Sequence, residues 1–310
     1  DDFIIIKSNG MPTYNYACVV DDHAMRLTHI IRAEEHLSNT PRQVLLYQAL
    51  GYELPQFAHV PMILAPDRSK LSKRHGATSV EEFRDQGYLQ EAIINYLALL
   101  GWSPEGTDEI MPLEDIVKQF SLERVSKNAA IYDTKKLTWI NGYYLRNLPG
   151  ERVVQETLPF LKRLGLIGEE PGEDELRLAH DSVLLTRDRA KTLEELADAV
   201  SYFFKDGFDY DEKGVQKHFS DPAAADRLRQ ARARLEALAD FTYESIESEY
   251  RQLAEELGIK AAQLIHPTRL ALSGRTIGPG LFELMALLGR EKCLKRLERA
   301  IDFIGQRTVE

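Results

Sequence analysis

The chain has 310 residues, of which 44% are hydrophobic and 28% are charged, and these are ordinary values for a globular protein. This length predicts two or three domains, and because there is no run of about 18 apolar residues, we expect no membrane span. The net charge of −10 argues against a non-specific coat on nucleic acid, although local basic strips could still bind RNA.

The cysteine and histidine patterns give no sign of a metal site. Cys18 and Cys293 are too far apart in sequence for a Cys-x-x-Cys pair, and the histidines lack zinc-ligand spacing. We therefore predict no metal ligands and a reducing, cytoplasmic compartment. The first residues contain neither a starting methionine nor a signal-peptide pattern, so we expect the natural chain to begin upstream of Asp1.

The first part of the chain has the pattern of a mixed α/β domain. Extended segments are predicted at residues 3–7, 13–20, 27–32 and 59–64, and an Asn-Gly turn follows the first of them. Thr40, Pro41 and Gln43 predict a helix that starts with a capping box, and Gly51 predicts its end. This strand–helix–strand order predicts a parallel sheet.

From residue 79 onward the pattern is helical. A capping box at 79–82 precedes predicted helices at 92–100, 113–120 and 135–144. Pro149-Gly150 is the clearest boundary, and almost every later segment is helix-like. We predict domains at 1–78, 79–148 and 149–310, the last of which could divide again into 149–240 and 241–310.

A compact basic turn lies at Lys70-Leu71-Ser72-Lys73-Arg74, after a predicted strand. Lysine suits a polyphosphate because its ammonium is a flexible point charge with three donors. Such a turn could clamp ATP phosphates and stabilise the charge that develops on leaving pyrophosphate. A solvated basic turn without function is the alternative.

The basic turn resembles the Lys-Met-Ser-Lys-Ser signature of class I aminoacyl-tRNA synthetases, in the form typical of glutamyl-tRNA synthetases. Further stretches resemble that family in order along the chain, at 10–22, 28–41, 76–102, 133–142 and 267–301. The resemblance implies a multidomain protein, with an α/β Rossmann-type class I catalytic half followed by a mostly α-helical stem-contact and anticodon-binding region. On this basis residues 1–78 would be the second half of the catalytic domain.

The resemblance also implies a glutamate pocket formed by Tyr14, Cys18 and Arg32. The Arg32 guanidinium would grip the side-chain carboxylate of glutamate through two parallel hydrogen bonds. The alternative for Arg32 is an ion pair with Glu34 or Glu35 at the end of a strand. Tyr14 could equally be a half-buried strand aromatic.

For ATP, the resemblance implies Lys73 as the main phosphate ligand and Lys70 and Ser72 as its catalytic neighbours. The backbone of Met62 and Ile63 would read adenine, and Glu35 would lie near the same nucleotide. Mg²⁺ would accompany ATP, but no protein ligand for it is evident.

For tRNA(Glu), the resemblance implies two sets of contacts. The acceptor stem would meet Lys135, Lys136, Trp139 and Asn141, although Trp139 could instead be a core residue. Arg187 would contact an anticodon base, and Ser273 begins a second anticodon segment. A loop N-cap before the helix at Leu281 is the alternative for Ser273.

The expected function is ATP-dependent ligation of glutamate to tRNA, catalysed by a monomer. No His-x-Gly-His segment occurs in the 310 residues, although the family uses that motif to hold ATP phosphates, so we expect the isolated segment to be inactive. The alternatives are a tRNA-binding module without catalysis, and a related glutaminyl or glutamyl-transferring enzyme. The large helical region after Pro149 argues against both of those relatives.

Overall fold

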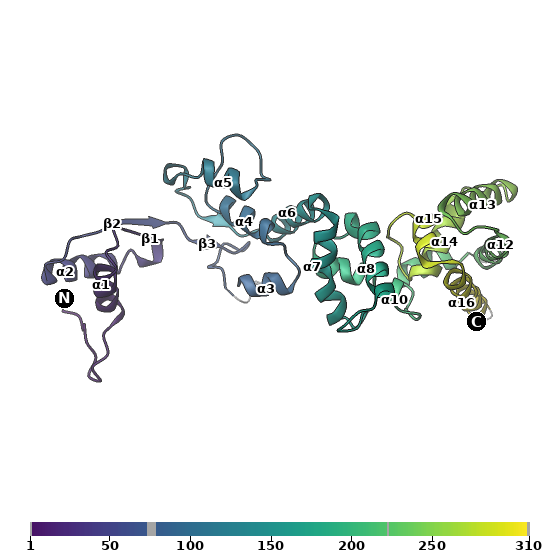
Figure 1. Ribbon diagram of the computed structural model, residues 1–310. Helices are drawn as coiled ribbons and strands as arrows, with labels where there is room; N and C mark the ends of the chain where they lie inside the picture. Colours follow the sequence, from purple (N-terminus) through teal and green to yellow (C-terminus); the bar gives the residue numbers. More distant parts are fainter. Residues whose placement is uncertain (1, 73–78, 222, 309–310) are drawn as a thin grey trace. The chain divides into compact units, whose positions relative to one another are not determined.

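The computed structural model describes residues 2–72, 79–221 and 223–308, and its chain divides into two compact units (Figure 1). The first unit consists of Asp1–Glu82 and Gln90–Ile140, and the second of Phe83–Leu89 and Asn141–Glu310. The three-domain boundaries at 78/79 and 148/149 stay predictions, because compactness alone separates the chain at other positions.

The first unit begins with a strand–helix–strand arrangement. Its elements are α1 (Tyr14–Ala24), β1 (His29–Ala33), the 3₁₀ helix η1 (Glu34–His36), α2 (Thr40–Leu50) and β2 (Gln56–Val60). The parallel pairing of β1 with β2 confirms the prediction. The helix over 40–50 is confirmed too, and its predicted stop at Gly51 has a left-handed φ of 71°.

Two early predictions are wrong. Residues 3–7 form no strand, and the segment makes only an isolated bridge between Ile6 and Pro12 around the confirmed turn at Gly10. The predicted extended run at 13–20 is instead the start of α1. Its Tyr and Val residues favour strands locally, but Val19 is buried against Leu46 and Tyr47 of α2, and this packing decides the structure.

The predicted capping box at Thr40 is also wrong. Gln43 is buried, and its side-chain amide donates to Asn15 Oδ1 on α1 at 3.1 Å instead of reaching back to Thr40. The Thr40 hydroxyl contacts Arg32, His36 and His59, so it does not cap the helix. Gln43 and Thr40 thus bond to residues outside α2 instead of to each other.

The rest of the first unit is built around short elements. Pro61 and Met62 separate β2 from β3 (Ile63–Leu64), which pairs in parallel with β4 (Ala130–Ile131). Between them lie α3 (Val80–Asp85), α4 (Gln90–Leu99), α5 (Leu113–Gln119) and η3 (Leu122–Arg124). The capping box at Ser79 and Glu82 is confirmed by reciprocal bonds of 3.0 and 3.2 Å. Both α3 and α6 (Thr134–Asn147) run across the division between the units.

The second unit is helical, as predicted. Its first half contains α7 (Gly150–Arg163), α8 (Glu173–Thr186), η4 (Arg187–Arg189), α9 (Leu193–Ala199) and α10 (Ser201–Phe204). Its second half contains α11 (Glu212–Gly214), the π-helix η5 (Val215–Phe219), α12 (Ala223–Ala237), α13 (Tyr243–Glu256), α14 (Ala262–Ser273), α15 (Leu281–Leu288) and α16 (Arg290–Thr308). The Thr192 hydroxyl accepts from the Glu195 amide at 3.1 Å, which confirms the predicted cap of α9.

A buried arginine ties the last helix to its neighbours. Arg296 on α16 is only 3% exposed, and its guanidinium donates to the carbonyl of Leu272 at 2.6 Å, of Tyr202 at 2.7 Å and of Lys205 at 2.9 Å. These carbonyls follow or end α10 and α14, where helices leave carbonyl groups without internal partners. One side chain therefore closes two helix ends.

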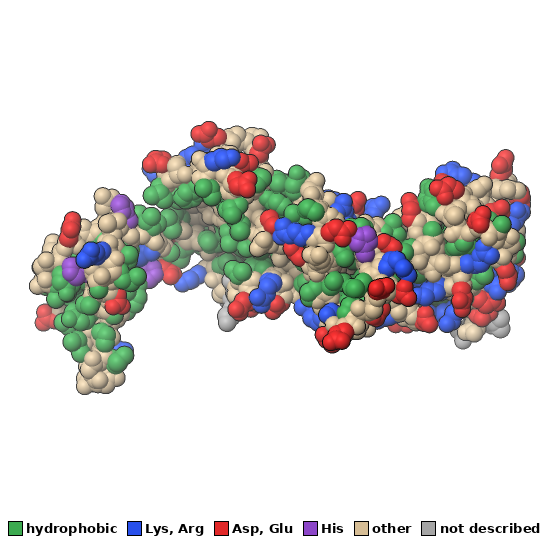
Figure 2. All heavy atoms as spheres, in the orientation of Figure 1, with side chains coloured by type: hydrophobic (Ala, Val, Ile, Leu, Met, Phe, Trp, Pro, Cys, Tyr) green, Lys and Arg blue, Asp and Glu red, His purple; other side chains and the backbone are tan. Residues whose placement is uncertain are grey.

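The two units differ in how much apolar surface they leave exposed. Among the described residues, the large hydrophobic side chains that face solvent belong to the first unit, except Tyr143, Leu164, Leu176 and Ile277. Figure 2 shows basic and acidic side chains interspersed over the helices of the second unit. Over the part of the chain that is described, no helix is both long and apolar enough to cross a membrane.

Two helix-ending glycines give a test of the close packing behind α14. Gly274 and Gly165 both have left-handed φ angles, 72° and 63°. A Cβ on Gly274 would lie 2.5 Å from the carbonyl oxygen of Asp209, whereas one on Gly165 would meet nothing within 4 Å. We expect Gly165→Ala to lower the free energy of unfolding by about 1 kcal/mol, and Gly274→Ala by about 3 kcal/mol or more. Equal losses in urea titrations would contradict this packing.

Two histidines of the second unit should give opposite pH dependences. Burial, together with His266 and Lys217, lowers the pKa of His218, so its stabilising contribution is present above its ordinary pKa and is lost as the pH falls through the lowered one. Hydrogen bonds to Asp181 and Glu151 raise the pKa of His180, so its contribution is present below its ordinary pKa and is lost as the pH rises through the raised one.

Thermal unfolding between about pH 5 and 8 tests both signs. His218→Gln should reduce the loss of stability on acidification, and His180→Gln should lower stability only at the acidic end. An unchanged acid limb in the first variant would show that His218 does not titrate as described.

Candidate functional site

The predicted glutamate-pocket residues lie together in the first unit. Tyr14 and Cys18 are one helical turn apart on α1, and Arg32 is on β1. The Tyr14 side chain is 53% exposed, and its hydroxyl lies 3.3 Å from His36 Nδ1. Partial desolvation and a hydrogen bond with Cys18 raise the pKa of Tyr14, and the nearby Arg32 opposes them. The three predicted side chains therefore interact electrostatically with one another.

Arg32 has a polar environment, and the Asp22 carboxylate interacts with it electrostatically. Its Nη2 donates to Thr40 Oγ1 at 2.9 Å, and its guanidinium carbon lies 5.5 Å from the centre of the Phe57 ring on β2. Its Nε is buried and has no hydrogen-bond partner. Among the described residues, no carboxylate lies within ion-pair distance of this guanidinium. Arg32 thus keeps donor capacity for an anionic ligand.

The two acidic residues that the sequence offered as ion-pair partners of Arg32 have other partners. Glu34 Oε1 accepts from the Met62 amide at 3.3 Å, and Glu35 Oε2 pairs with Lys70 Nζ at 2.5 Å. The hydrogen bond and charge of Lys70 lower the pKa of the Glu35 carboxyl. The alternative in which Arg32 is a structural ion-pair partner of Glu34 or Glu35 is therefore wrong for this structure.

A second buried polar atom lies near the same pocket. Tyr47 on α2 is 2% exposed, and its hydroxyl has no hydrogen-bond partner. Burial raises the pKa of Tyr47, and its hydroxyl also interacts electrostatically with Asp22, Cys18 and Arg32. Sequence reasoning missed this residue, because Tyr47 on the apolar side of a helix is indistinguishable from a core aromatic.

The predicted ATP-binding residues lie at the carboxyl end of the strand pair and beyond it. Ile63 on β3 is 39% exposed, and the Lys70 side chain is 67% exposed. The turn before Lys70 is fixed by Asp67, whose Oδ1 accepts from the Ser69 amide at 2.9 Å and from its hydroxyl at 2.6 Å. Lys70 thus follows an ordered turn, while Lys73 lies outside the described residues.

The predicted stem-contact residues have different environments. Lys135 is exposed, as is Trp139 at 48%, so Trp139 is not a core residue. Lys136 pairs with Glu109 at 2.6 Å. Asn141 is fully buried in the second unit, where its Oδ1 accepts from the Leu89 amide at 2.7 Å and its Nδ2 donates to the Lys191 carbonyl. This placement gives Asn141 a structural role and leaves Lys135 and Trp139 as accessible candidates.

In the second unit, the two predicted anticodon segments meet at one small cavity. Its volume is about 240 Å³, and its lining includes Thr186 and Arg189 from the predicted basic segment at 186–191, and Arg275 from the predicted segment at 273–275. Thr276 and Ile277, which follow that second segment, line it too. Ser273 is only 4% exposed, and its hydroxyl accepts from the Arg275 amide at 3.2 Å. Ser273 therefore shapes the loop after α14 instead of lining the cavity, and the alternative that makes it a cap before Leu281 is wrong.

The Arg187 side chain, 29% exposed, donates to the Leu148 carbonyl at 3.4 Å and does not line this cavity. Arg189, Thr276 and Ile277 were missed as individual candidates. Ile277, at 75% exposed, is the most exposed of the large hydrophobic side chains described, but only the structure shows this.

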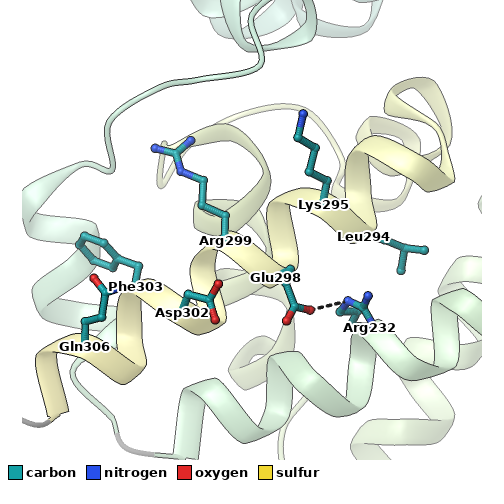
Figure 3. Close-up of a pocket in the computed structure, with 8 residues that line it drawn as sticks. All are labelled: Arg232, Leu294, Lys295, Glu298, Arg299, Asp302, Phe303 and Gln306. Atoms are coloured by element: carbon teal, nitrogen blue, oxygen red, sulfur yellow. Dashed lines mark ion pairs between the residues drawn. The ribbon is translucent and has the colours of Figure 1, made fainter.

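A larger cavity of about 570 Å³ lies along α16 and contains no predicted site residue (Figure 3). Glu298 of α16 forms an ion pair with Arg232 of α12 at 2.7 Å across it, while Lys295 and Arg299 project away from α12. Charges of both signs line this cavity, so it has no clear preference for one class of ligand. Among the described residues, no group of three or more His, Cys, Asp or Glu side chains could hold a metal ion.

Two known families match this chain, one over the region of the candidate glutamate site and one over the region of the candidate anticodon cavity. Residues 1–139 match the family described as tRNA synthetases class I (E and Q), catalytic domain, and residues 152–301 match the anticodon binding domain.

Individual relatives agree with these families. The chain is 66% identical to the glutamate–tRNA ligase of Moorella thermoacetica over 99% of its length, and 58% identical to that of Desulforudis audaxviator over 98%. It spans 62% and 61% of these two relatives' own lengths. A crystal structure of a glutamate tRNA ligase from Elizabethkingia meningosepticum, in complex with its amino acid, has a TM-score of 0.81 and 33% identity, covering 98% of this chain and 62% of that one.

These matches run through both units and agree in sequence and in fold. The chain belongs to the glutamate–tRNA ligase family, and it carries class I catalytic-domain residues followed by a helical anticodon-binding domain.

Proposed function

We propose that the complete protein ligates glutamate to tRNA(Glu) at the expense of ATP, through a glutamyl-adenylate. The observation that carries this proposal is the environment of Arg32, whose guanidinium has a buried Nε without a partner and no carboxylate partner among the described residues. A guanidinium held in this way favours a ligand with its own carboxylate. Glutamine offers only a neutral amide at that position, so its binding would be weaker.

In the first step, the α-carboxylate of glutamate attacks the α-phosphorus of ATP, which forms the mixed anhydride and releases pyrophosphate. Arg32, Tyr14 and Cys18 hold the amino acid. Lys70, Ser72 and Lys73 act on the phosphates, and the Met62–Ile63 backbone with Glu35 holds the adenosine. The ammonium of Lys70 uses one of its three donors on Glu35, 2.5 Å away, and keeps two for phosphate. Mg²⁺ would enter with ATP, whose phosphate oxygens are its usual ligands.

In the second step, a terminal hydroxyl of the tRNA 3′ adenosine attacks the carbonyl carbon of the adenylate and releases AMP. Lys135 and Trp139 are the accessible candidates for the acceptor stem, together with Lys136 once it leaves Glu109. Arg187 and the cavity lined by Arg189 and Arg275 are the candidates for the anticodon. We further propose that the protein acts in the cytoplasm as a monomer.

The role of Arg32 can be tested by ATP–pyrophosphate exchange with the complete protein in the presence of tRNA. Arg32→Ala should lower kcat/KM for glutamate by about 100-fold or more, because truncation removes charge-assisted hydrogen bonds to the substrate. The matched control is Arg42→Ala, which removes an exposed arginine from α2 and should leave the exchange unchanged. Wild-type activity in a folded Arg32→Ala variant would remove Arg32 from the site.

The neighbouring lysines Lys135 and Lys136 allow a test of the stem contact. Lys135→Ala should weaken tRNA binding and reduce the slope of log K against log salt concentration by about 1, because one phosphate contact is lost. Lys136→Ala should have a smaller effect, since Lys136 must first give up its ion pair with Glu109. If filter-binding titrations give both variants the wild-type salt slope, these lysines do not contact phosphate.

A further inference from the structure

The hydroxyl of Thr40 contacts Arg32 of the predicted glutamate pocket and two residues beside it. Thr40 Oγ1 accepts from Arg32 Nη2 at 2.9 Å, lies 3.0 Å from His59 Nε2, and lies 3.2 Å from the carbonyl oxygen of His36. These partners come from three different elements, β1, β2 and η1. A single oxygen thus joins the pieces that surround the pocket.

The parallel pairing explains why Thr40 can reach both strands. Arg32 and His59 are register partners in the β1–β2 pair, so their side chains leave the sheet on the same face. Thr40 is the first residue of α2, the helix that connects the two strands, and it lies over that face. Thr40, at the start of α2, can therefore contact the side chains of both Arg32 and His59.

The hydrogen-bonding capacity of a hydroxyl fits these contacts. A threonine hydroxyl has one proton and two acceptor lone pairs. All three contacts become hydrogen bonds when Thr40 donates to the His36 carbonyl and accepts from Arg32 Nη2 and from a proton on His59 Nε2. This arrangement uses every donor and acceptor site of the hydroxyl, so the direction of the Arg32 guanidinium is fixed.

The same contact extends to the second predicted pocket residue. The Thr40 hydroxyl contacts the His36 carbonyl. The distance from Nδ1 of the His36 ring to the Tyr14 hydroxyl is 3.3 Å. Thr40 therefore touches Arg32 directly and Tyr14 through one intermediate residue. Its hydroxyl does not cap α2, since no side-chain cap bond is present at that helix start.

We propose that Thr40, supported by His59, is a positioning residue that sets the orientation of the glutamate-binding guanidinium. This inference rests on the proposed function of Arg32. With Nη2 held by Thr40 and the arginine stacked against Phe57, the unpartnered Nε and the remaining donors have one fixed direction in which to meet a carboxylate. In this proposal Thr40 acts on amino-acid selection chiefly through Arg32, its direct partner.

The test compares Thr40→Val, which keeps the shape of the side chain without the hydroxyl, with Thr40→Ser, which keeps the hydroxyl. Both are measured in the complete protein by ATP–pyrophosphate exchange with glutamate, with glutamine, and at varied ATP. Thr40→Val should raise KM for glutamate about 10-fold or more and lower the preference for glutamate over glutamine. It should leave KM for ATP unchanged, and kcat should change much less than KM, since the lost orientation affects binding.

Thr40→Ser should restore the wild-type KM and amino-acid preference. In an Arg32→Ala background, Thr40→Val should add little, because the two residues act through one contact. Circular dichroism and thermal unfolding check that Thr40→Val is folded. If it is not, the same exchange assay compares His59→Gln, which can still hydrogen-bond to Thr40, with His59→Phe, which cannot.

The outcomes separate the two proposals. If the wild-type protein shows no glutamate-dependent exchange, the proposed function fails, and this inference fails with it. If the wild-type protein and Arg32→Ala behave as proposed but a folded Thr40→Val has the wild-type KM and selectivity, only the positioning role is overturned. An equal rise of KM for ATP and for glutamate would indicate general damage and would also overturn it.

Discussion

The parallel pairing of β1 with β2 is the constraint on which the candidate amino-acid site depends. The register places Arg32 opposite His59 and brings Phe57 under the guanidinium, while the connecting helix α2 returns over the same face. A slip of one residue would turn Arg32 to the other face, away from Tyr14 and Cys18. The arrangement of the candidate glutamate-binding side chains therefore depends on the register of β1 with β2.

In the second unit, residues from two segments that are far apart in sequence line one cavity. The Arg296 guanidinium donates to backbone carbonyls at the ends of α10 and α14 and thereby joins these two helices. The loop after α14 then leaves from a fixed point, and Ser273 and Gly274 direct its first residues. Arg275 of this loop lines one cavity together with Arg189. The net charge of −10 does not prevent such local positive sites.

Much of the fold could be predicted from sequence where local signals and tertiary partners agree. The glycine stop at Gly51, the capping box at Ser79 and the parallel order of β1 and β2 are examples, because each depends on nearby residues. Residues 13–20 were predicted wrongly because Tyr and Val favour strands, while burial of Val19 against α2 favours a helix. Similarly, Gln43 had an available local partner but bonds Asn15 instead.

The environment of the candidate site residues could not be predicted from the sequence. Sequence resemblance named Arg32, Tyr14 and Lys70, yet it could not show that Glu34 and Glu35 bind Met62 and Lys70 instead of Arg32. It also named Asn141 and Ser273 as tRNA contacts, and it could not show that both side chains are buried. A polar residue in a motif is consistent with either role, and only its exposure and its partners distinguish them.

The bond between Asn141 and Leu89 has a consequence for how this architecture can vary. The chain leaves the second unit after Leu89 and returns at Asn141, and the Asn141 amide holds the exit and the return together. Residues 90–140, which belong to the same compact unit as residues 1–82, are therefore flanked on both sides by residues that share one hydrogen bond. Loops within residues 90–140 can therefore change in length while the two flanking positions stay joined by this hydrogen bond.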